Sequence, residues 1–568
     1  MPLSYKSARN LTIVAFFLRG AFYCAEQPMW EGFDEWAHFG YIQHLAQSGR
    51  APSRSEQVSD ELRRSVELVP ISAAATESSA GSLTHDAFWQ LPLEERLSRE
   101  RELRELRPSY KSEPLANNVL RQYEAQQPPL YYSFLALVYR AVKDYSLPTR
   151  VFILRFVTLF IGALGILLGW EIAREVPSSR RAAIPVLLLL ALSPGLLVDL
   201  TRIANDGLAL TLGSAFLLCL FRIFHGASRL RAWMLAGAAL GAAVLTKSYM
   251  LALVPLLPLA ALIELSRGRL RLPQAAGRIL LAFAFAASIA GWWYAGVWRA
   301  TGTVSGEQID IAAAGFGLSG KLAAVGSIHW LRVLDSAATT HIWTSGWSFL
   351  VVRSWMYRVF ECAAVAAGVG LIALTVQISR KVYRRGLGVG DACLSLIALA
   401  YLFFCSGVAY FAIVVYLTRG ISTALGWYLD GVAGIEAVLF ASGFTGLFGT
   451  RRAAGCVAAI AVLAGILDLY TVHFVSAPYY AGLTAHVPSG FLATFHPASL
   501  RGIGLSGVFA RLSMNKPVGL GPYALMALWI GYLCATAALA AYAGVLVKNT
   551  LSPLPDEQAS DISFLVRQ

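Results

Sequence analysis

The stretch RVFILRFVTLFIGALGILLGWEIA, residues 150–173, is almost continuously apolar, apart from two arginines and one glutamate. As a helix it is long enough to cross about 30 Å of hydrocarbon. Similar runs recur on both sides of it, so the chain is predicted to be an all-α polytopic membrane protein with about twelve transmembrane helices. The other runs are residues 11–29, 183–200, 207–224, 232–246, 249–264, 277–298, 356–378, 391–417, 426–448, 453–473 and 522–547.

The composition supports the membrane class and narrows the function. Mean hydropathy is +0.56, and only 14% of the residues are charged, which is too few for an ordinary soluble surface. The net charge of +13 comes from basic residues in short clusters between apolar runs, a pattern typical of cytoplasmic loops. Nucleic acid is therefore not an expected partner, whereas membrane lipids are. All seven cysteines lie in or beside apolar runs, which argues against a disulfide framework and a thiolate metal site.

One apolar segment, residues 129–142, is too short to count as a crossing. If it lies in the outer interface or re-enters it, every basic cluster falls on the cytoplasmic side. Residues 1–568 then form a single membrane domain with both termini cytoplasmic. Three large hydrophilic segments emerge on the outer side, at residues 30–128, with interfacial helices, and at 299–355 and 474–521.

Residues 91–114, in the first outer segment, place leucines at roughly helical spacing among many charges. An amphipathic helix lying in the membrane interface would show this pattern. A solvated helix packed on a small core of the loop itself would show it equally well. Both interpretations remain open from the sequence.

The segment PMWEGFDEWAHFGYIQHLAQSGRAP, residues 28–52, places Asp34 and Glu35 where the first helix has just left the bilayer. Asp34 could simply be the N-cap of a helix, with Glu35 in its first turn. Adjacent residues do not share a helix face, so one carboxylate could instead meet a substrate while the other has a structural role. His38 lies one turn after Asp34 and could orient it or bind an acceptor.

A second outer carboxylate, Asp206, occurs in TRIANDGLAL, residues 201–210, at the start of a predicted helix. Here too a helix cap is the simplest interpretation. The functional alternative pairs Asp206 with the Asp34 site, where it would either steer an acceptor or share a divalent cation. The sequence leaves the need for a metal undetermined.

The short outer turns should be poor in cations, yet three of them hold one each. An outward cation near the lipid headgroups can bind a phosphate, or it can snorkel and anchor a helix end. Because three such cations occur on the side of Asp34 and Asp206, we favour a functional role. These cations are Arg202, Lys247 and Arg419.

Several short patterns occur in an order that resembles the GT-C class of integral-membrane glycosyltransferases, which includes protein mannosyltransferases and the aminoarabinose transferase of lipid A. The resemblance covers about the first 265 residues. The patterns are FDEWAHFGYIQHLAQSG (33–49), QQPPLYYSFLALVYRAV (126–142), LRFVTLFIGALGILLGWEIARE (154–175), RIANDGLAL (202–210) and VLTKSYMLALVP (244–255).

The resemblance implies a polyprenyl-phosphate sugar as donor and a glycan, lipid or protein acceptor at the outer face. Asp34 would be the general base, with Glu35 beside it, and Asp206 would be the second acidic site. Lys247 would contact the donor phosphate. Residues 127–132 would correspond to the outer juxtamembrane helix of the family, with Tyr131 near the substrate, although Gln127 replaces a basic residue found in some relatives.

The residue types suit this chemistry. Sugar transfer develops positive charge on the anomeric carbon, so a carboxylate that takes the acceptor proton also stabilises that charge. The departing phosphate gains negative charge, which Lys247, Arg202 or Arg419 could neutralise. A bacterial cytoplasmic membrane, with the active site facing outward, is the expected location.

Two other classes of function remain open. A secondary transporter would use acids near the middle of the membrane, such as Asp430, Glu436 and Asp468, although no internal repeat is visible. A scaffold or flippase-like component of polysaccharide assembly would need the outer segments but not Asp34. Substitution of Asp34 should abolish a transferase, whereas substitution of Glu436 should abolish a transporter.

Overall fold

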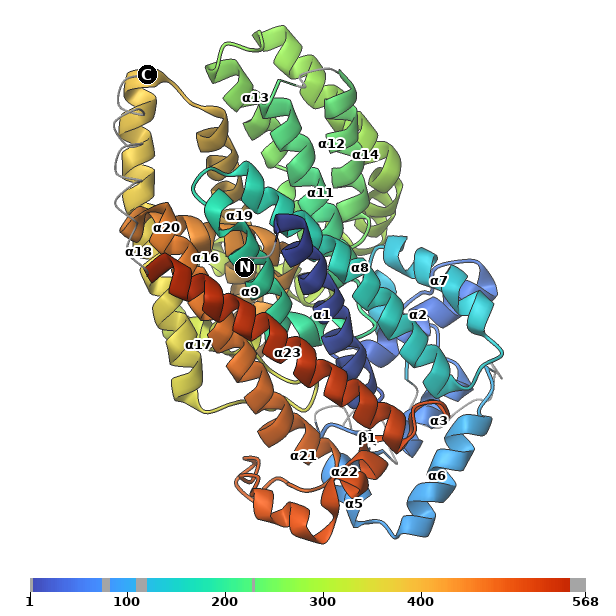
Figure 1. The fold of residues 1–568 in the computed structure, drawn as a ribbon. Coiled ribbons are helices and arrows are strands. Elements are labelled where there is room, and N and C mark those ends of the chain that lie inside the picture. The colour runs from blue at the N-terminus through green and yellow to red at the C-terminus, as the bar shows by residue number, and fades with distance from the viewer. Residues whose placement is uncertain (1–3, 74–81, 109–119, 227–229, 552–568) are drawn as a thin grey trace.

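The computed structural model describes residues 4–73, 82–108, 120–226 and 230–551, and its regular structure is almost entirely helical (Figure 1). The helices of the bundle are α1 (Tyr5–Glu26), α8 (Leu147–Glu175), α9 (Ala183–Leu192), α10 (Pro194–Leu200), α11 (Asp206–Phe224), α12 (Leu230–Val244), α13 (Leu256–Ser266), α14 (Leu272–Thr301), α18 (Ser354–Arg385), α19 (Val389–Arg419), α20 (Ala433–Tyr470) and α23 (Pro522–Leu551).

Shorter elements fill the three segments that the sequence places outside the bundle. The sheet seen in the described residues is one parallel pair, β1 (Pro70–Ile71) and β2 (Leu83–Thr84). The short helices are α2 (Glu35–Ser48), α3 (Asp60–Leu68), α5 (His85–Gln90), α6 (Leu93–Glu105), η1 (Tyr123–Gln126), α7 (Leu130–Val142), α15 (Gln308–Ala313), α16 (Gly317–Ser327), α17 (Trp330–Ile342), α21 (Ala477–Tyr480), η7 (Pro497–Gly502) and α22 (Gly504–Leu512).

Nine helices among the described residues are long and apolar enough to cross a membrane, or ten if the bent pair α9–α10 counts as one span. The expected number of twelve is therefore not confirmed. Helix α1 is not among the nine, because arginines lower its hydropathy, and α12 has only 15 residues. Two expected spans form one run, Gly426–Tyr480, which bends at Gly449 with a φ of 76°. A further apolar helix, Gln308–Ser327, lies inside the expected second outer segment.

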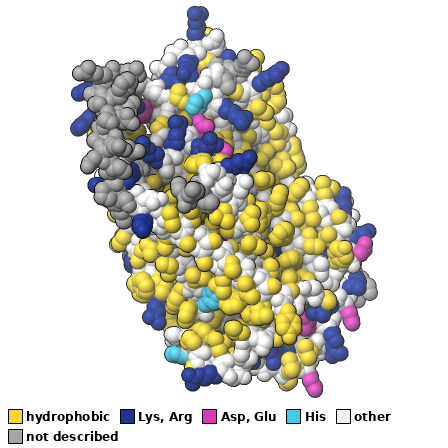
Figure 2. All heavy atoms as spheres, viewed as in Figure 1, with side chains coloured by type: hydrophobic (Ala, Val, Ile, Leu, Met, Phe, Trp, Pro, Cys, Tyr) yellow, Lys and Arg dark blue, Asp and Glu magenta, His cyan; other side chains and the backbone are white. Residues whose placement is uncertain are grey.

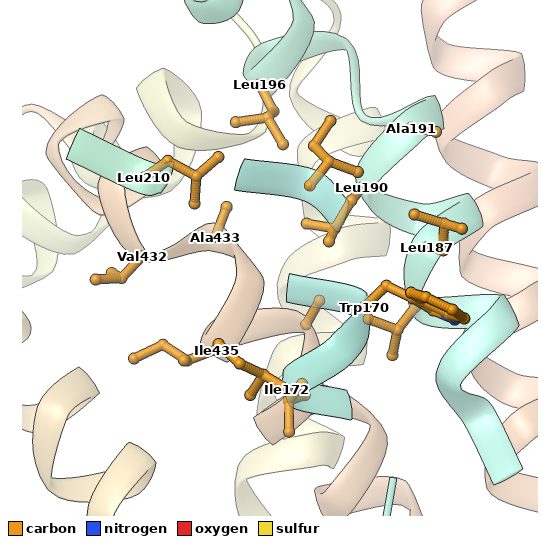
Figure 3. Packing of buried hydrophobic residues seen from close by; sticks show 14 of the residues in the cluster. Trp170, Ile172, Leu187, Leu190, Ala191, Leu196, Leu210, Val432, Ala433 and Ile435 are labelled. Carbon is orange, nitrogen blue, oxygen red and sulfur yellow. The ribbon is translucent and has the colours of Figure 1, made fainter. Parts of the chain in front are cut away.

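The bundle core forms where α8, α9, α11 and α20 pack together. Figure 3 shows Trp170 of α8, Leu187 and Leu190 of α9 and Ile435 of α20 in this core, where all are buried. A Cβ on Gly169 of α8 would lie only 3.0 Å from the Cα of Gly434, so α8 and α20 approach backbone to backbone. Figure 2 shows hydrophobic side chains over the middle of the viewed face. Together with the apolar helices, this surface identifies an integral membrane protein.

The first and third hydrophilic segments gather at one end of the bundle, which we call the loop end. In Figure 1, α3, α5 and α6 of the first segment lie beside α21 and α22 of the third. Hydrogen bonds join them, since His486 bonds Asp86 at 2.8 Å and the backbone N–H of Asn515 donates to the Glu100 carboxylate at 3.2 Å. The loop end is thus a folded layer in which distant parts of the chain meet.

Two expectations, one for residues 129–142 and one for residues 91–114, can be compared with this layer. Residues 130–142 form the 13-residue helix α7, which packs on α2 and has exposed Phe134 and Leu137. This length agrees with a helix that does not cross the membrane. In helix α6, Leu103 is fully buried in a hydrophobic cluster of the first segment while Leu93 is exposed, as expected for a helix packed on a core of the loop; a position in the membrane interface stays a prediction. Residues 109–114 lie outside the described residues.

Candidate active site

The turn that joins α1 to α2 carries Asp34 and Glu35, and Arg155 of α8 holds this turn in place. The Arg155 guanidinium donates to the main-chain carbonyls of Gln27 at 2.7 Å and Pro28 at 2.6 Å. It also forms a two-pronged ion pair with Glu35, at 2.7 and 2.6 Å. A single buried arginine therefore fixes the end of one helix relative to the start of the next.

Both carboxylate oxygens of Glu35 are occupied. Besides the Arg155 pair, they accept the backbone N–H groups of Trp30 and Ile203, each at 3.1 Å. The side chain is fully buried. A carboxylate bound in this way is a positioning group for the Asp34 turn, and its lone pairs are directed at protein donors. Of the two adjacent acids, Glu35 is the one with the structural role.

Asp34 occupies the N-cap position of α2, but it does not act as a cap. Its backbone is left-handed, with φ 54° and ψ 16°, and its side chain makes no capping hydrogen bond. Within residues 4–73, 82–108, 120–226 and 230–551, the Asp34 carboxylate has no ion pair or hydrogen bond. A left-handed backbone costs a residue other than glycine roughly 1–2 kcal/mol, and such strain concentrates at functional sites. Asp34 is therefore available to a substrate.

The electrostatic surroundings of Asp34 suit proton transfer. Burial raises the pKa of Asp34 to about 6, and the charge of Asp206 acts in the same direction. The charges of Arg202 and Lys247 oppose this rise. A carboxyl group whose pKa lies near the working pH can both hold and release a proton, which is what a general base needs.

Asp206 is the centre of a buried charge cluster. The Lys247 ammonium lies 2.5 Å from one of its oxygens, and the Tyr249 hydroxyl donates to the same oxygen at 2.9 Å. The Arg202 guanidinium lies 3.4 Å from the other oxygen and also pairs with Asp199. Asp206 therefore does not cap its helix, and it holds two cations beside the Asp34 turn.

The three cations predicted from the outer turns lie in different surroundings. Arg202 and Lys247 are only 3% and 7% exposed, so neither snorkels to a surface, and the Arg202 guanidinium lies 5.2 Å from the ring centre of Phe33. Arg419 is exposed at the end of α19. Its charge lowers the pKa of Tyr123, which burial and nearby carboxylates raise. Arg419 thus lies at the rim, whereas Arg202 and Lys247 lie inside.

The remaining predicted residues differ in their access to the site. His38 Nδ1 and the Tyr132 hydroxyl are 2.7 Å apart. Burial lowers the pKa of His38 well below its usual value, and the Lys247 charge adds to this effect, so the imidazole is neutral at neutral pH. Tyr131 is fully buried, and its hydroxyl bonds Thr158 at 2.7 Å. Tyr131 therefore packs beneath the site.

Two further carboxylates, Glu124 and Glu307, were missed by the sequence analysis. Glu307 accepts hydrogen bonds from the Gln127 amide at 3.1 Å and the Ser248 hydroxyl at 3.3 Å. Glu124 of η1 is 4% exposed, and its Oε2 has no hydrogen-bond partner among the described residues. Gln127, which replaces the basic residue of some relatives, thus binds a carboxylate. An acid just before the 129–142 run was the only available signal for Glu124.

The segment after α17 crosses the Asp34 turn and is held by Glu31. The Glu31 carboxylate accepts the Ser348 N–H at 2.8 Å and its hydroxyl at 2.9 Å, and it lies 3.2 Å from His85. The backbone N–H of Trp347 donates to the Glu31 carbonyl at 2.7 Å. Nearby, the rings of Phe33 and Trp427 stack at 4.0 Å. Aromatic side chains and the 343–353 segment therefore enclose one side of the turn.

The deep acid Asp468, which favoured a transporter, belongs to a closed network between helices. It pairs with Arg19 at 2.9 Å and accepts the hydroxyls of Tyr23 at 2.5 Å and Tyr532 at 2.7 Å. Both charged side chains are fully buried. These contacts join α1, α20 and α23, so they account for Asp468 without a transported ion.

The other two acids that favoured a transporter share one histidine. His341 of α17 lies 3.1 Å from Asp430 and 2.9 Å from Glu436. This histidine precedes the 343–353 segment, so the two ion pairs seat that segment on the bundle. Asp430 and Glu436 therefore have protein partners as well.

A divalent cation at Asp34 and Asp206 is not supported by a ligand set. Among the described residues, no group of three or more His, Cys, Asp and Glu side chains is arranged to hold a metal ion. The oxygens of Asp206 already face Lys247 and Arg202. We therefore assign no chemical step to a metal.

Comparison with known proteins supports the class that the motifs indicate. Residues 126–293 match the family model of dolichyl-phosphate-mannose-protein mannosyltransferases. Among solved structures, the chain is similar to ArnT from Cupriavidus metallidurans bound to undecaprenyl phosphate, with 14% identity and a TM-score of 0.43 over 94% of this chain and 76% of that chain. It is also similar to the apo oligosaccharyltransferase of Archaeoglobus fulgidus, with 14% identity and a TM-score of 0.42 over 91% of this chain and 59% of that chain.

No curated protein sequence matches the chain. The family match begins at Gln126, just before α7, and extends into α14. It therefore includes Arg155, Arg202, Asp206 and Lys247, the residues that surround the Asp34 turn. The matched segment confirms the resemblance of this chain to the integral-membrane glycosyltransferases of the GT-C class.

Proposed function

We propose that the protein transfers a sugar from a polyprenyl-phosphate donor to an acceptor at the loop end, on the outer face of a bacterial cytoplasmic membrane. The proposal depends mainly on the surroundings of the Asp34 carboxylate. This carboxylate has no protein partner among the described residues, and it lies beside the buried cations Arg202 and Lys247. A free base next to fixed positive charge is what transfer from a phosphate requires.

The reaction step is a substitution at the anomeric carbon. An acceptor oxygen forms a bond to this carbon, while the bond from carbon to the phosphate oxygen breaks and its electron pair leaves with the phosphate. The acceptor proton moves to Asp34. Because the anomeric carbon becomes positive in the transition state, the same carboxylate also stabilises it.

Lys247 and Arg202 are the groups best placed to meet the departing phosphate. Both are buried, where an ion contact is stronger than in water. Each is already held by Asp206, which orients it before the donor arrives. An ammonium has three donors, so Lys247 can bind a phosphate oxygen while it keeps its contact with Asp206.

The test is donor consumption by the purified protein in lipid. A panel of labelled polyprenyl-phosphate sugars is offered with membrane extract as the source of acceptor, and the wild type is compared with Asp34→Asn. Asp335→Asn is the matched control, since Asp335 is exposed on α17 and pairs with Arg358. Turnover of one donor that is lost in folded Asp34→Asn, but kept in the control, supports the proposal. No turnover of any donor by the wild type would overturn it.

A further inference from the structure

The carboxyl group of Glu124 differs from its neighbours because it is buried and only partly satisfied. The side chain is 4% exposed, and its Oε2 has no hydrogen-bond partner in the part of the chain that the structure describes. Leaving a buried polar atom unpaired destabilises a protein. Glu307, close by, has both oxygens bonded: Oε1 accepts from Gln127 and Ser248, and Oε2 accepts from the Gln126 amide at 3.4 Å. Glu124 therefore differs from Glu307 in having one carboxyl oxygen without a protein partner among the described residues.

Hydrogen bonds of neighbouring residues place Glu124 beside the charge cluster. Gln127, three residues after Glu124, accepts the Asn205 amide at 3.3 Å and donates to Glu307, which also accepts the hydroxyl of Ser248, the residue after Lys247. Burial raises the pKa of Glu124 well above its usual value, and the charges of Asp34 and Glu307 raise it further, while Lys247 opposes them. The Glu124 charge in turn raises the pKa of Tyr132, whose hydroxyl bonds His38. Glu124 therefore lies within electrostatic reach of both the proposed base and the proposed phosphate-binding cation.

In the proposed reaction, the group that lies between the base and the phosphate is the sugar ring. We propose that Glu124 binds a hydroxyl group of the transferred sugar and thereby helps to select which sugar the protein accepts. The inference rests on the proposed function, because it takes Asp34 as the base that meets the acceptor and Lys247 as the cation that meets the departing phosphate. A glutamate can accept a hydrogen bond from a sugar hydroxyl, and in its protonated form it can also donate one.

Recognition of this kind should be strong. A site built to bond a hydroxyl discriminates against an analogue that lacks it, because the buried protein group is then left unpaired. A buried hydrogen-bonding group that is left unpaired is unfavourable enough to change kcat/KM by roughly 10-fold to 100-fold. Glu124 is a specificity residue in this scheme, and Asp34 remains the base.

The experiment is a double-mutant cycle between the protein and the donor. It uses the donor identified from the panel and its monodeoxy analogues, each lacking one ring hydroxyl. The rate kcat/KM is measured for the wild type, Glu124→Gln and Glu124→Ala. If Glu124 binds one of these hydroxyls, its removal should lower kcat/KM about 10-fold or more in the wild type and far less in Glu124→Ala. Glu124→Gln keeps the size of the side chain and should fold if the alanine variant does not.

Glu307→Gln is the matched control, because Glu307 is a half-buried carboxylate nearby and both of its oxygens are bonded to the protein. For every analogue, its kcat/KM should fall by the same factor as in the wild type, since a structural defect does not depend on a single sugar hydroxyl. If removing a hydroxyl lowers kcat/KM by the same factor in the Glu124 variants as in the wild type, for every analogue, the inference is wrong. Wild-type turnover would still support the transferase. If the wild type consumes no donor, both proposals fall.

Discussion

Acids with little access to water occur in two regions of this protein, at the Asp34 turn of the loop end, where Asp34 is half-buried, and around Asp468 inside the bundle, where Asp468 is fully buried. Asp468 is bonded to Arg19, Tyr23 and Tyr532, so its negative charge is fully matched by the protein. Asp34 has no such partner among the described residues. The comparison teaches that burial of an acid in a membrane protein does not by itself mark function. What distinguishes a functional acid is an unused hydrogen-bonding capacity.

The largest expected effect is the loss of activity in Asp34→Asn. General base catalysis contributes about 100-fold to 10,000-fold, so kcat should fall by that factor. Folding stability should rise, because the folded state holds the Asp34 proton more tightly than the unfolded chain and therefore disfavours the charged form at neutral pH. Turnover and the thermal unfolding midpoint of the same preparation would be measured. A variant that loses both activity and stability would mean that Asp34 is structural.

The opposite result is expected for Asp468→Ala. This change leaves the Arg19 guanidinium buried without its carboxylate, and breaking such a pair costs about 3–5 kcal/mol. The unfolding midpoint should fall clearly, whereas the kcat of the protein that remains folded should be close to wild type. Unfolding curves together with turnover per folded molecule would check this. Normal stability with lost turnover would instead mean that Asp468 has a functional role.

A smaller effect on the rate of donor turnover is expected when the pH is lowered, and it tests the role of the Asp34 region. If Asp34 must be ionised to accept a proton, kcat/KM should be half-maximal near its pKa of about 6 and fall about tenfold for each further pH unit of acidification. The sign follows from the role, since protonation at low pH removes the base. The pH dependence of donor turnover would be followed in the wild type and in the control Asp335→Asn. A rate that does not fall between pH 7 and pH 5 would contradict the role of Asp34.

The smallest effect is expected for Glu436→Gln. His341 keeps its contact with Asp430, and the glutamine can still hydrogen-bond the imidazole, so sugar transfer should change little. Donor turnover would be measured beside uptake of labelled solutes into vesicles. A transporter predicts the reverse, with uptake that depends on Glu436 and no donor consumption.

Part of the fold followed from the sequence alone. The helix over residues 147–175, the short helix at 130–142 and the helix start at Asp34 all appear where the apolar runs and turn residues predict them. The expected number of spans was less successful, because charges lower the hydropathy of α1 and an apolar helix occurs within residues 299–355. Hydropathy records average polarity over a window, so it misplaces helices whose apolar surface is incomplete or interrupted.

The candidate site was predictable only in outline. Asp34, Asp206, Arg202 and Lys247 were singled out by polar residues at the ends of apolar runs, and the structure brings them together. Arg155 had a visible signal, a charge inside an apolar run, but its partner Glu35 is 120 positions away. Glu124 had almost no signal.

The sequence by itself determined that this is a membrane protein with polar segments outside the bundle and Asp34 at a helix boundary. Those properties depend on the length and polarity of local runs, which the chain carries wherever it folds. Only the tertiary structure decided that Glu35 is bound by Arg155, that Asp468 is bound by Arg19, and that Asp34 has no partner in the described part of the chain. Whether a buried charge has a partner depends on contacts between distant segments, and no local pattern encodes them.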